Sequence, residues 1–205
     1  MRTLAAALSI ALLAACSSSD SPPPATFGGF APQAQTAVIF APRTCTLPVV
    51  GPTSVSGVAI AFTSFADPCA VLQDTLFCGT EASSSAILAV ALSGLVGGGT
   101  VGDTGPGTYP YLANPPTTSS FRASLGDGAM VDASCASVAG GSLDMAGGQI
   151  VLASVDGAGV TGSVDLRFDD GSAFQHAIDA TVCPMTYDVC DLFVPCYPHQ
   201  CVPAP

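Results

Sequence analysis

The chain has few charged side chains, and positive ones are the scarcest. Its 205 residues include no lysine and only four basic residues against 15 acidic ones, for a net charge of −11. Nucleic-acid binding draws most of its affinity from basic side chains that neutralise phosphates, so we expect no nucleic-acid partner. The same shortage argues against electrostatic attachment to anionic lipid. Solubility alone explains the acidity.

Side chains that commonly perform catalysis are also rare. Histidine occurs only at His176 and His199, and glutamate only at Glu81. The chain contains no Gly-x-Ser-x-Gly, Ser-x-x-Lys or His-Glu-x-x-His motif. The glycine-rich run 97–105 has no lysine and no following helix pattern, so it predicts a flexible loop and not a phosphate-binding site. We therefore expect no catalytic residues and no cofactor.

A short apolar run near the N-terminus ends in a cysteine. Arg2 precedes the apolar stretch 4–13, two alanines follow, and Cys16 stands directly before the polar segment 17–24. This order is typical of a signal peptide. A transmembrane helix needs about 20 apolar residues, and this run is shorter. A leader that is cleaved without lipid addition is the other alternative.

The residues around this cysteine, Leu13-Ala14-Ala15-Cys16, resemble the lipobox of bacterial lipoproteins. The resemblance implies that residues 1–15 are a signal peptide, and that Cys16 becomes an N-terminus carrying several acyl chains such as palmitate. One chain alone would anchor a protein only marginally. Ser17 in place of aspartate implies transfer to the outer membrane, and leaves the membrane face open. The membrane is the partner that we expect; any protein or envelope partner stays open.

Cysteine is the second strong signal. Eight cysteines follow Cys16, and an even number in an exported chain predicts four disulfides. They permit 105 pairings. Position suggests one grouping, with Cys69 bonded to Cys78, Cys135 to Cys183, and a tail cysteine to Cys45. The tail lacks the Cys-x-x-Cys spacing common in structural zinc sites, so we expect no metal there. The eight are Cys45, Cys69, Cys78, Cys135, Cys183, Cys190, Cys196 and Cys201.

Short β-like runs divided by glycine, proline and aspartate follow a polar segment that reads as a tether. We predict a central strand at 86–95, for which a short helix is the alternative, and a turn at 126–128 between two strands. Pro110 predicts an edge strand at 107–113, because proline cannot donate to a ladder. The remaining early strands are predicted at 55–65, 118–125 and 129–133.

The clearest structural prediction is a three-strand meander at 149–155, 160–168 and 173–182. Both connections carry the Asp-Gly chemistry of tight hairpins. In the middle strand Val164, Leu166 and Phe168 share one face, which predicts a buried side and a wet side. His176 falls between apolar neighbours in the third strand, so we expect a buried, hydrogen-bonded histidine.

Eight or nine strands without a convincing helix predict an all-β fold, an antiparallel sandwich or barrel with a disulfide-rich C-terminal tail. We expect the lipidated cysteine and tether at 16–35, one β-domain at 36–183, and a cysteine-rich tail packed on it at 184–205.

Part of the chain is similar to a group of uncharacterised bacterial lipoproteins. The shared features are the segments 148–155 and 160–168, the following Cys183, and an upstream Gly-Pro-Gly-Thr-Tyr at 105–109. The likeness covers roughly residues 55–183. It implies a related β-domain and brings no known activity, because the group has none.

Together these features predict a membrane-anchored envelope lipoprotein that acts as a structural or binding module and is not an enzyme. A small-ligand carrier with a lipocalin-like barrel is the first alternative. The second is an extracytoplasmic hydrolase, which would need clustered carboxylates with raised pKa values. Calcium binding by aspartates 165, 169, 170 and 179 is disfavoured because Asp-Asp-Gly is ordinary turn chemistry.

Overall fold

The computed structural model is all-β. It describes residues 32–47, 51–70, 80–83, 85–96, 100–102, 104–113, 121–184 and 200–203. Apart from helical residues 68–70, each regular element in these ranges is a strand. The strands are β1 (Ala34–Leu47), β2 (Gly51–Thr63), β3 (Thr80–Ser83), β4 (Ala86–Val96), β5 (Thr100–Gly102), β6 (Gly107–Pro110), β7 (Phe121–Val131), β8 (Ser137–Val155), β9 (Gly159–Phe168), β10 (Ala173–Val182) and β11 (Gln200–Pro203).

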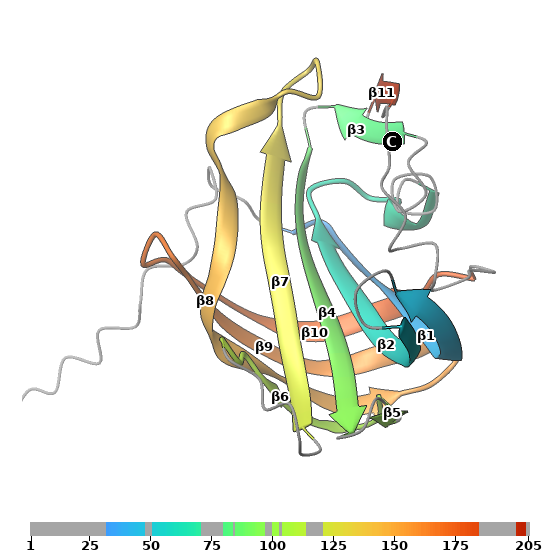
Figure 1. Ribbon diagram of the computed structural model, residues 1–205. Coiled ribbons are helices and arrows are strands. Elements are labelled where there is room, and N and C mark those ends of the chain that lie inside the picture. Colours follow the sequence, from blue (N-terminus) through green and yellow to red (C-terminus); the bar gives the residue numbers. More distant parts are fainter. Residues whose placement is uncertain are drawn as a thin grey trace, which may run out of the picture.

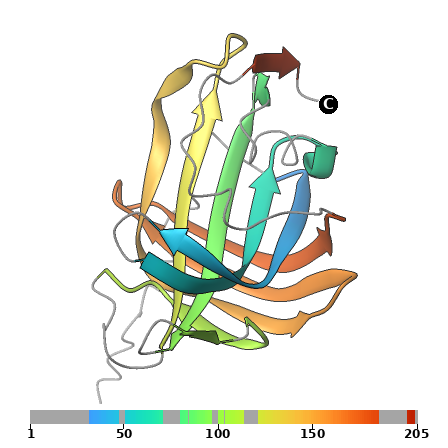
Figure 2. The same cartoon turned by 45° about the vertical axis from the view of Figure 1, so that its right-hand side comes forward.

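Most strands belong to one curled sheet. Its order is β2-β1-β10-β9-β8-β7-β4-β5, and β4 also pairs with β2, so the pairings form a closed circuit. In Figures 1 and 2, β8, β7 and β4 run upright while β9 and β10 cross beneath them. The all-β prediction is confirmed. The sheet is mixed, however, because β1 and β10 are parallel, whereas the prediction was purely antiparallel.

The long strand β8 bends and belongs to both parts of the curled sheet, the part that contains β7 and β4 and the part that contains β9 and β10. Up to Asp144 it pairs with β7, and from Met145 onward it pairs with β9, with a register shift before Gly147. At Gly148 φ is +101°, and a Cβ atom there would collide with the backbone of Asp165. Bulges and glycines let a strand bend sharply, so glycine at 148 lets β8 serve both parts.

The core lies between the two parts of the curled sheet. Its largest fully buried side chains include Phe62, Tyr109, Ile150 and Leu166, which belong to one continuous hydrophobic cluster. The predicted alternation of the middle meander strand is confirmed: Val164, Leu166 and Phe168 are buried, while Ser163 and Arg167 are exposed. The meander therefore supplies one wall of the core.

One prediction about strand limits is wrong and another is confirmed. The turn at 126–128 does not exist, because β7 continues through it and pairs there with residues 88–90 of β4. This ladder outweighs the local turn preference of Gly-Asp-Gly. The strand predicted at 86–95 is confirmed, and the helix alternative is excluded, since β4 fills that range. At the N-terminal side, β1 begins at Ala34, two residues before the predicted start of the β-domain.

Candidate functional site

The structure describes the side chains of four of the nine cysteines. Cys16, Cys78, Cys190, Cys196 and the side chain of Cys45 lie outside the described residues, as do His199 and Gly97–Gly99. Four cysteines are described, and they form two disulfides, Cys69–Cys183 and Cys135–Cys201. Disulfide formation is thus confirmed for these four.

Two of the suggested cysteine pairings are wrong, and the third, of a tail cysteine with Cys45, lies outside the described side chains. Cys69 bonds to Cys183 and not to Cys78, and Cys135 bonds to Cys201 and not to Cys183. The reason is the parallel pairing of β1 with β10, which brings the end of β10 beside the start of β1. Because Ala34 in β1 pairs with Thr63 at the end of β2, the segment after β2 arrives at the same place. Distance along the chain does not reveal this approach.

The junction between β1 and β10, called the seam below, is the shortest junction in the closed circuit. Only Thr36 with Thr181 and Ala37 with Val182 are in register. The amide of Cys183 extends it by donating to the carbonyl of Ala37 at 2.8 Å. The seam therefore needs support from side chains and from the disulfide.

Thr36 provides that support on the buried side of the seam. The side chain is 1% exposed, and its hydroxyl donates to the carbonyl of Thr181 at 2.9 Å. The same oxygen lies 3.2 Å from Sγ of Cys69 and 2.8 Å from Sγ of Cys183. One hydroxyl thus contacts both strands and both sulfurs of the Cys69–Cys183 disulfide.

Gln35 provides support on the outer side of the seam. Its amide nitrogen donates to the carbonyl of Ala177 at 3.0 Å, and its amide oxygen accepts from the backbone nitrogen of Asp179 at 3.0 Å. These two bonds reproduce what a backbone peptide would do. The side chain therefore continues the short ladder along β10.

His176 lies beside this glutamine and is exposed, so the prediction of a buried histidine is wrong. Its Nδ1 is 2.7 Å from the carbonyl oxygen of Ala177 and 3.3 Å from Nε2 of Gln35. The ring stacks on Phe174, with centroids 5.7 Å apart. The imidazole thus contacts a core phenylalanine and stays exposed, although its strand position is on the same face as the buried residues Phe174 and Ile178.

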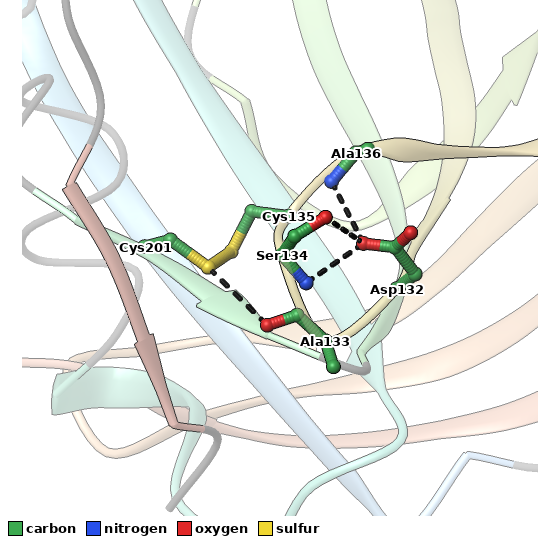
Figure 3. Close-up of a disulfide and its surroundings, with 6 residues drawn as sticks. All are labelled: Asp132, Ala133, Ser134, Cys135, Ala136 and Cys201. Atoms are coloured by element: carbon green, nitrogen blue, oxygen red, sulfur yellow. Dashed lines mark hydrogen bonds between the residues drawn. A yellow bond between two sulfur atoms is a disulfide. The ribbon is translucent and has the colours of Figure 1, made fainter.

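The second disulfide joins Cys135, in the turn between β7 and β8, to Cys201 of β11 (Figure 3). Oδ1 of Asp132 accepts from the Ser134 hydroxyl at 2.7 Å and from the backbone nitrogens of Ser134 at 2.8 Å and Ala136 at 3.1 Å. These bonds, the Ser134 hydroxyl first, lower the pKa of the Asp132 carboxyl. Cys135 has a φ of 59°, a conformation that non-glycine residues seldom adopt. The carboxylate therefore organises a turn that holds Cys135 in place.

The Gly-Pro-Gly-Thr-Tyr segment has a structural role. Tyr109 is fully buried, and its hydroxyl donates to the carbonyl of Gly105 at 2.6 Å. Burial raises the pKa of this phenol, opposed by the charge of Arg122. The guanidinium carbon of Arg122 lies 5.2 Å from the ring centroid, and its Nη1 donates to the carbonyl of Pro106 at 2.7 Å. A Cβ atom at Gly107 would occupy the position of that nitrogen.

The aspartates named as a candidate calcium site serve local roles. Asp165 accepts from Gln175 at 3.2 Å, and Asp170 accepts from the Ser172 backbone at 2.8 Å to close its turn. In the part of the chain that the structure describes, no three His, Cys, Asp or Glu side chains come together as a metal site would require. The same part holds no helix long and apolar enough to cross a bilayer.

Comparison of the chain with protein-family models, with curated proteins and with solved structures finds no match in any of the three. The resemblance to uncharacterised bacterial lipoproteins therefore stays a prediction. What the structure shows is an all-β domain with disulfides.

Sequence reasoning missed the residues that hold the two disulfides in place. Thr36 and Gln35 fall at the border between the predicted tether and domain, where no strand was predicted. Asp132 did carry a usable signal: aspartate followed two residues later by serine is typical of a side-chain-to-backbone turn.

Proposed function

We propose that the protein is a lipid-anchored module of the bacterial cell envelope, which acts by structure or binding and not by catalysis. The observation that carries the proposal is the lipobox-like Leu13-Ala14-Ala15-Cys16, followed directly by a polar spacer. The two disulfides support it, because disulfides persist in oxidising compartments outside the cytoplasm. Acyl chains on Cys16 would hold the β-domain at the membrane.

The outer membrane is the proposed location. Ser17 follows the anchoring cysteine, and the lipoproteins that the segment resembles are retained at the inner membrane when aspartate stands there. The proposal therefore makes residue 17 the determinant of sorting.

The packing of the interior favours a module over a carrier of apolar ligands. A carrier needs open space inside its barrel. The large side chains Phe62, Tyr109, Ile150 and Leu166 are each less than 2% exposed and belong to one continuous cluster. Retained lipid after gentle purification would reverse this preference.

The test is expression of the full chain in a Gram-negative bacterium fed an alkyne analogue of palmitate. We expect the wild type to incorporate the label and to partition into outer-membrane fractions. Cys16→Ser should lose the label and appear in the soluble periplasmic fraction. Ser17→Asp, the matched control, should keep the label and move to the inner membrane. Unlabelled wild-type protein, or a Cys16→Ser variant that stays on membranes, would overturn the proposal.

A further inference from the structure

The two disulfides differ in their access to solvent. Cys183 is 3% exposed and Cys69 is partly exposed, and both sulfurs of their disulfide lie within 3.2 Å of the Thr36 hydroxyl oxygen. Cys201 is exposed and Cys135 is partly exposed. Thiol–disulfide exchange requires a thiolate to reach one sulfur, so access controls its rate. Loop length does not distinguish the two, since separations of 114 and 66 residues change closure probability by a factor of about two.

Cys201 tethers a small sheet that stands apart from the curled sheet. β11 pairs in parallel only with β3, from Gln200 opposite Thr80 to Pro203 opposite Ser83. Both views place this pair beside the turn between β7 and β8 (Figures 1 and 2). An isolated two-stranded sheet is marginally stable in water. Only two residues separate β3 from β4 along the chain, so the backbone joins β3 to the curled sheet. Within the described ranges, the Cys135–Cys201 bond is the one covalent cross-link from β11 to the curled sheet.

The turn that contains Cys135 is held by hydrogen bonds of its own. The Asp132 carboxylate holds the turn through three hydrogen bonds. Two backbone bonds add to it: Cys135 donates to the Asp132 carbonyl, and Asp132 donates to the Ala136 carbonyl, both at 3.0 Å. None of these bonds involves the sulfurs. Cleavage of the disulfide would therefore remove this cross-link from β11, while the turn would keep Cys135 in position for the bond to form again.

We propose that Cys135–Cys201 is a reversible redox latch that holds or releases β11, while Cys69–Cys183 stays closed. The reductant is a dithiol. Its thiolate attacks the exposed Sγ of Cys201, the bond between the two sulfurs breaks, and Cys135 leaves as a thiolate that takes a proton from water. The second thiol of the reductant then cleaves the mixed disulfide. Two electrons pass to the protein, Cys201 becomes a thiol, and the reductant becomes a disulfide.

Release changes the surface of the protein. Without β11, the edge of Thr80–Ser83 that pairs with Gln200–Pro203 becomes unpaired as well, at the end of the molecule that carries the β7–β8 turn. Open strand edges accept extended peptides as an added strand. This inference concerns the disulfide alone and does not depend on lipidation of Cys16.

The first test measures the order of reduction. The oxidised full chain is incubated with increasing dithiothreitol, quenched with N-ethylmaleimide, and mapped by peptide mass spectrometry. We expect Cys135 and Cys201 to be half-labelled at a dithiothreitol concentration at least about tenfold below that needed for Cys69 and Cys183. Labelling of both pairs at the same concentration, or of Cys69 and Cys183 first, would overturn the proposal.

The second test asks whether the bond holds the strand. After selective reduction, hydrogen exchange should rise at Thr80–Ser83 and Gln200–Val202, stay unchanged in β9 and β10, and return to its starting level with oxidised glutathione. The double variant Cys135→Ser/Cys201→Ser should show the raised exchange without any reductant. Asp132→Asn should slow the return of hydrogen exchange to its starting level after oxidised glutathione is added. Ser137→Ala, the surface control, should not. Exchange in the double variant equal to that of the wild type would contradict the latch.

Discussion

The hydroxyl of Thr36 supports the shortest junction of the curled sheet. It bonds to β10 and touches both sulfurs of Cys69–Cys183. We predict that Thr36→Val lowers the free energy of unfolding by about 1–2 kcal/mol, because a buried hydrogen bond is lost while the side-chain volume is kept. Urea denaturation measures the change. Thr36→Ser, which keeps the hydroxyl, should cost less; a larger loss for serine than for valine would mean that methyl packing matters more.

Gly148 lies where β8 bends between the two parts of the sheet. Its φ of +101° and the close Asp165 backbone leave no place for a side chain. We predict that Gly148→Ala costs about 2 kcal/mol or more. Gly157→Ala is the control, since a Cβ there meets nothing within 4 Å. Thermal unfolding of the two variants checks this, and equal melting temperatures would show that the bend tolerates alanine.

Two turn aspartates predict an acid limit of stability. Hydrogen bonds from Ser134 and Ala136 lower the pKa of Asp132, and backbone bonds from Ala158 and Gly159 lower that of Asp156. A carboxyl whose pKa is lower in the folded state stabilises the fold above its unfolded pKa, near 4, and loses that contribution as pH falls through the folded value. We expect these two turns to contribute evenly between pH 8 and 5 and to weaken below about pH 4.

Melting temperatures across this pH range, for the wild type and for Asp132→Asn/Asp156→Asn, test that expectation. Because both carboxylates are exposed, the effect should be small. Below pH 4 the melting temperature of the variant should fall less than that of the wild type. A variant that falls as steeply as the wild type would assign the acid limit to other groups.

At the scale of elements, the two disulfides should contribute unequally. Their loop lengths alone predict a difference of only about 0.5 kcal/mol. Cys69–Cys183 also supports the seam, so we predict that its removal by double alanine substitution lowers the free energy of unfolding by about 2–5 kcal/mol. Removal of Cys135–Cys201 should cost clearly less. Chemical denaturation measures the free energy of unfolding of both variants. Equal losses would indicate that the disulfides stabilise the fold through chain entropy alone.

The meander β8–β9–β10 was predictable because each connection contains an Asp-Gly pair, which favours a tight hairpin turn whatever the rest of the chain does. The seam was not, because it joins Thr36 to Thr181 by a parallel pairing across most of the chain. The turn expected at 126–128 failed for a similar reason. Gly126-Asp127-Gly128 favours a turn in isolation, but β4 offers a ladder along its whole length.

At the scale of the whole molecule, the fold class followed from strand patterning, and the disulfide chemistry followed from the even number of cysteines. The disulfide connectivity did not follow, because it depends on which strand ends meet when the sheet curls. The same holds for exposure. His176 shares its strand with Phe174 and Ile178, yet only the assembled structure shows that it lies outside, against Gln35.

We propose that a lipid on Cys16 holds the cross-linked β-domain at the cell envelope. The most direct measurement is the mass of the N-terminal peptide from protein extracted from membranes. We predict a peptide that begins at Cys16 and carries acyl chains on that residue. A peptide that retains residues 1–15, or that begins at or after Cys16 with no acyl mass, would contradict the account.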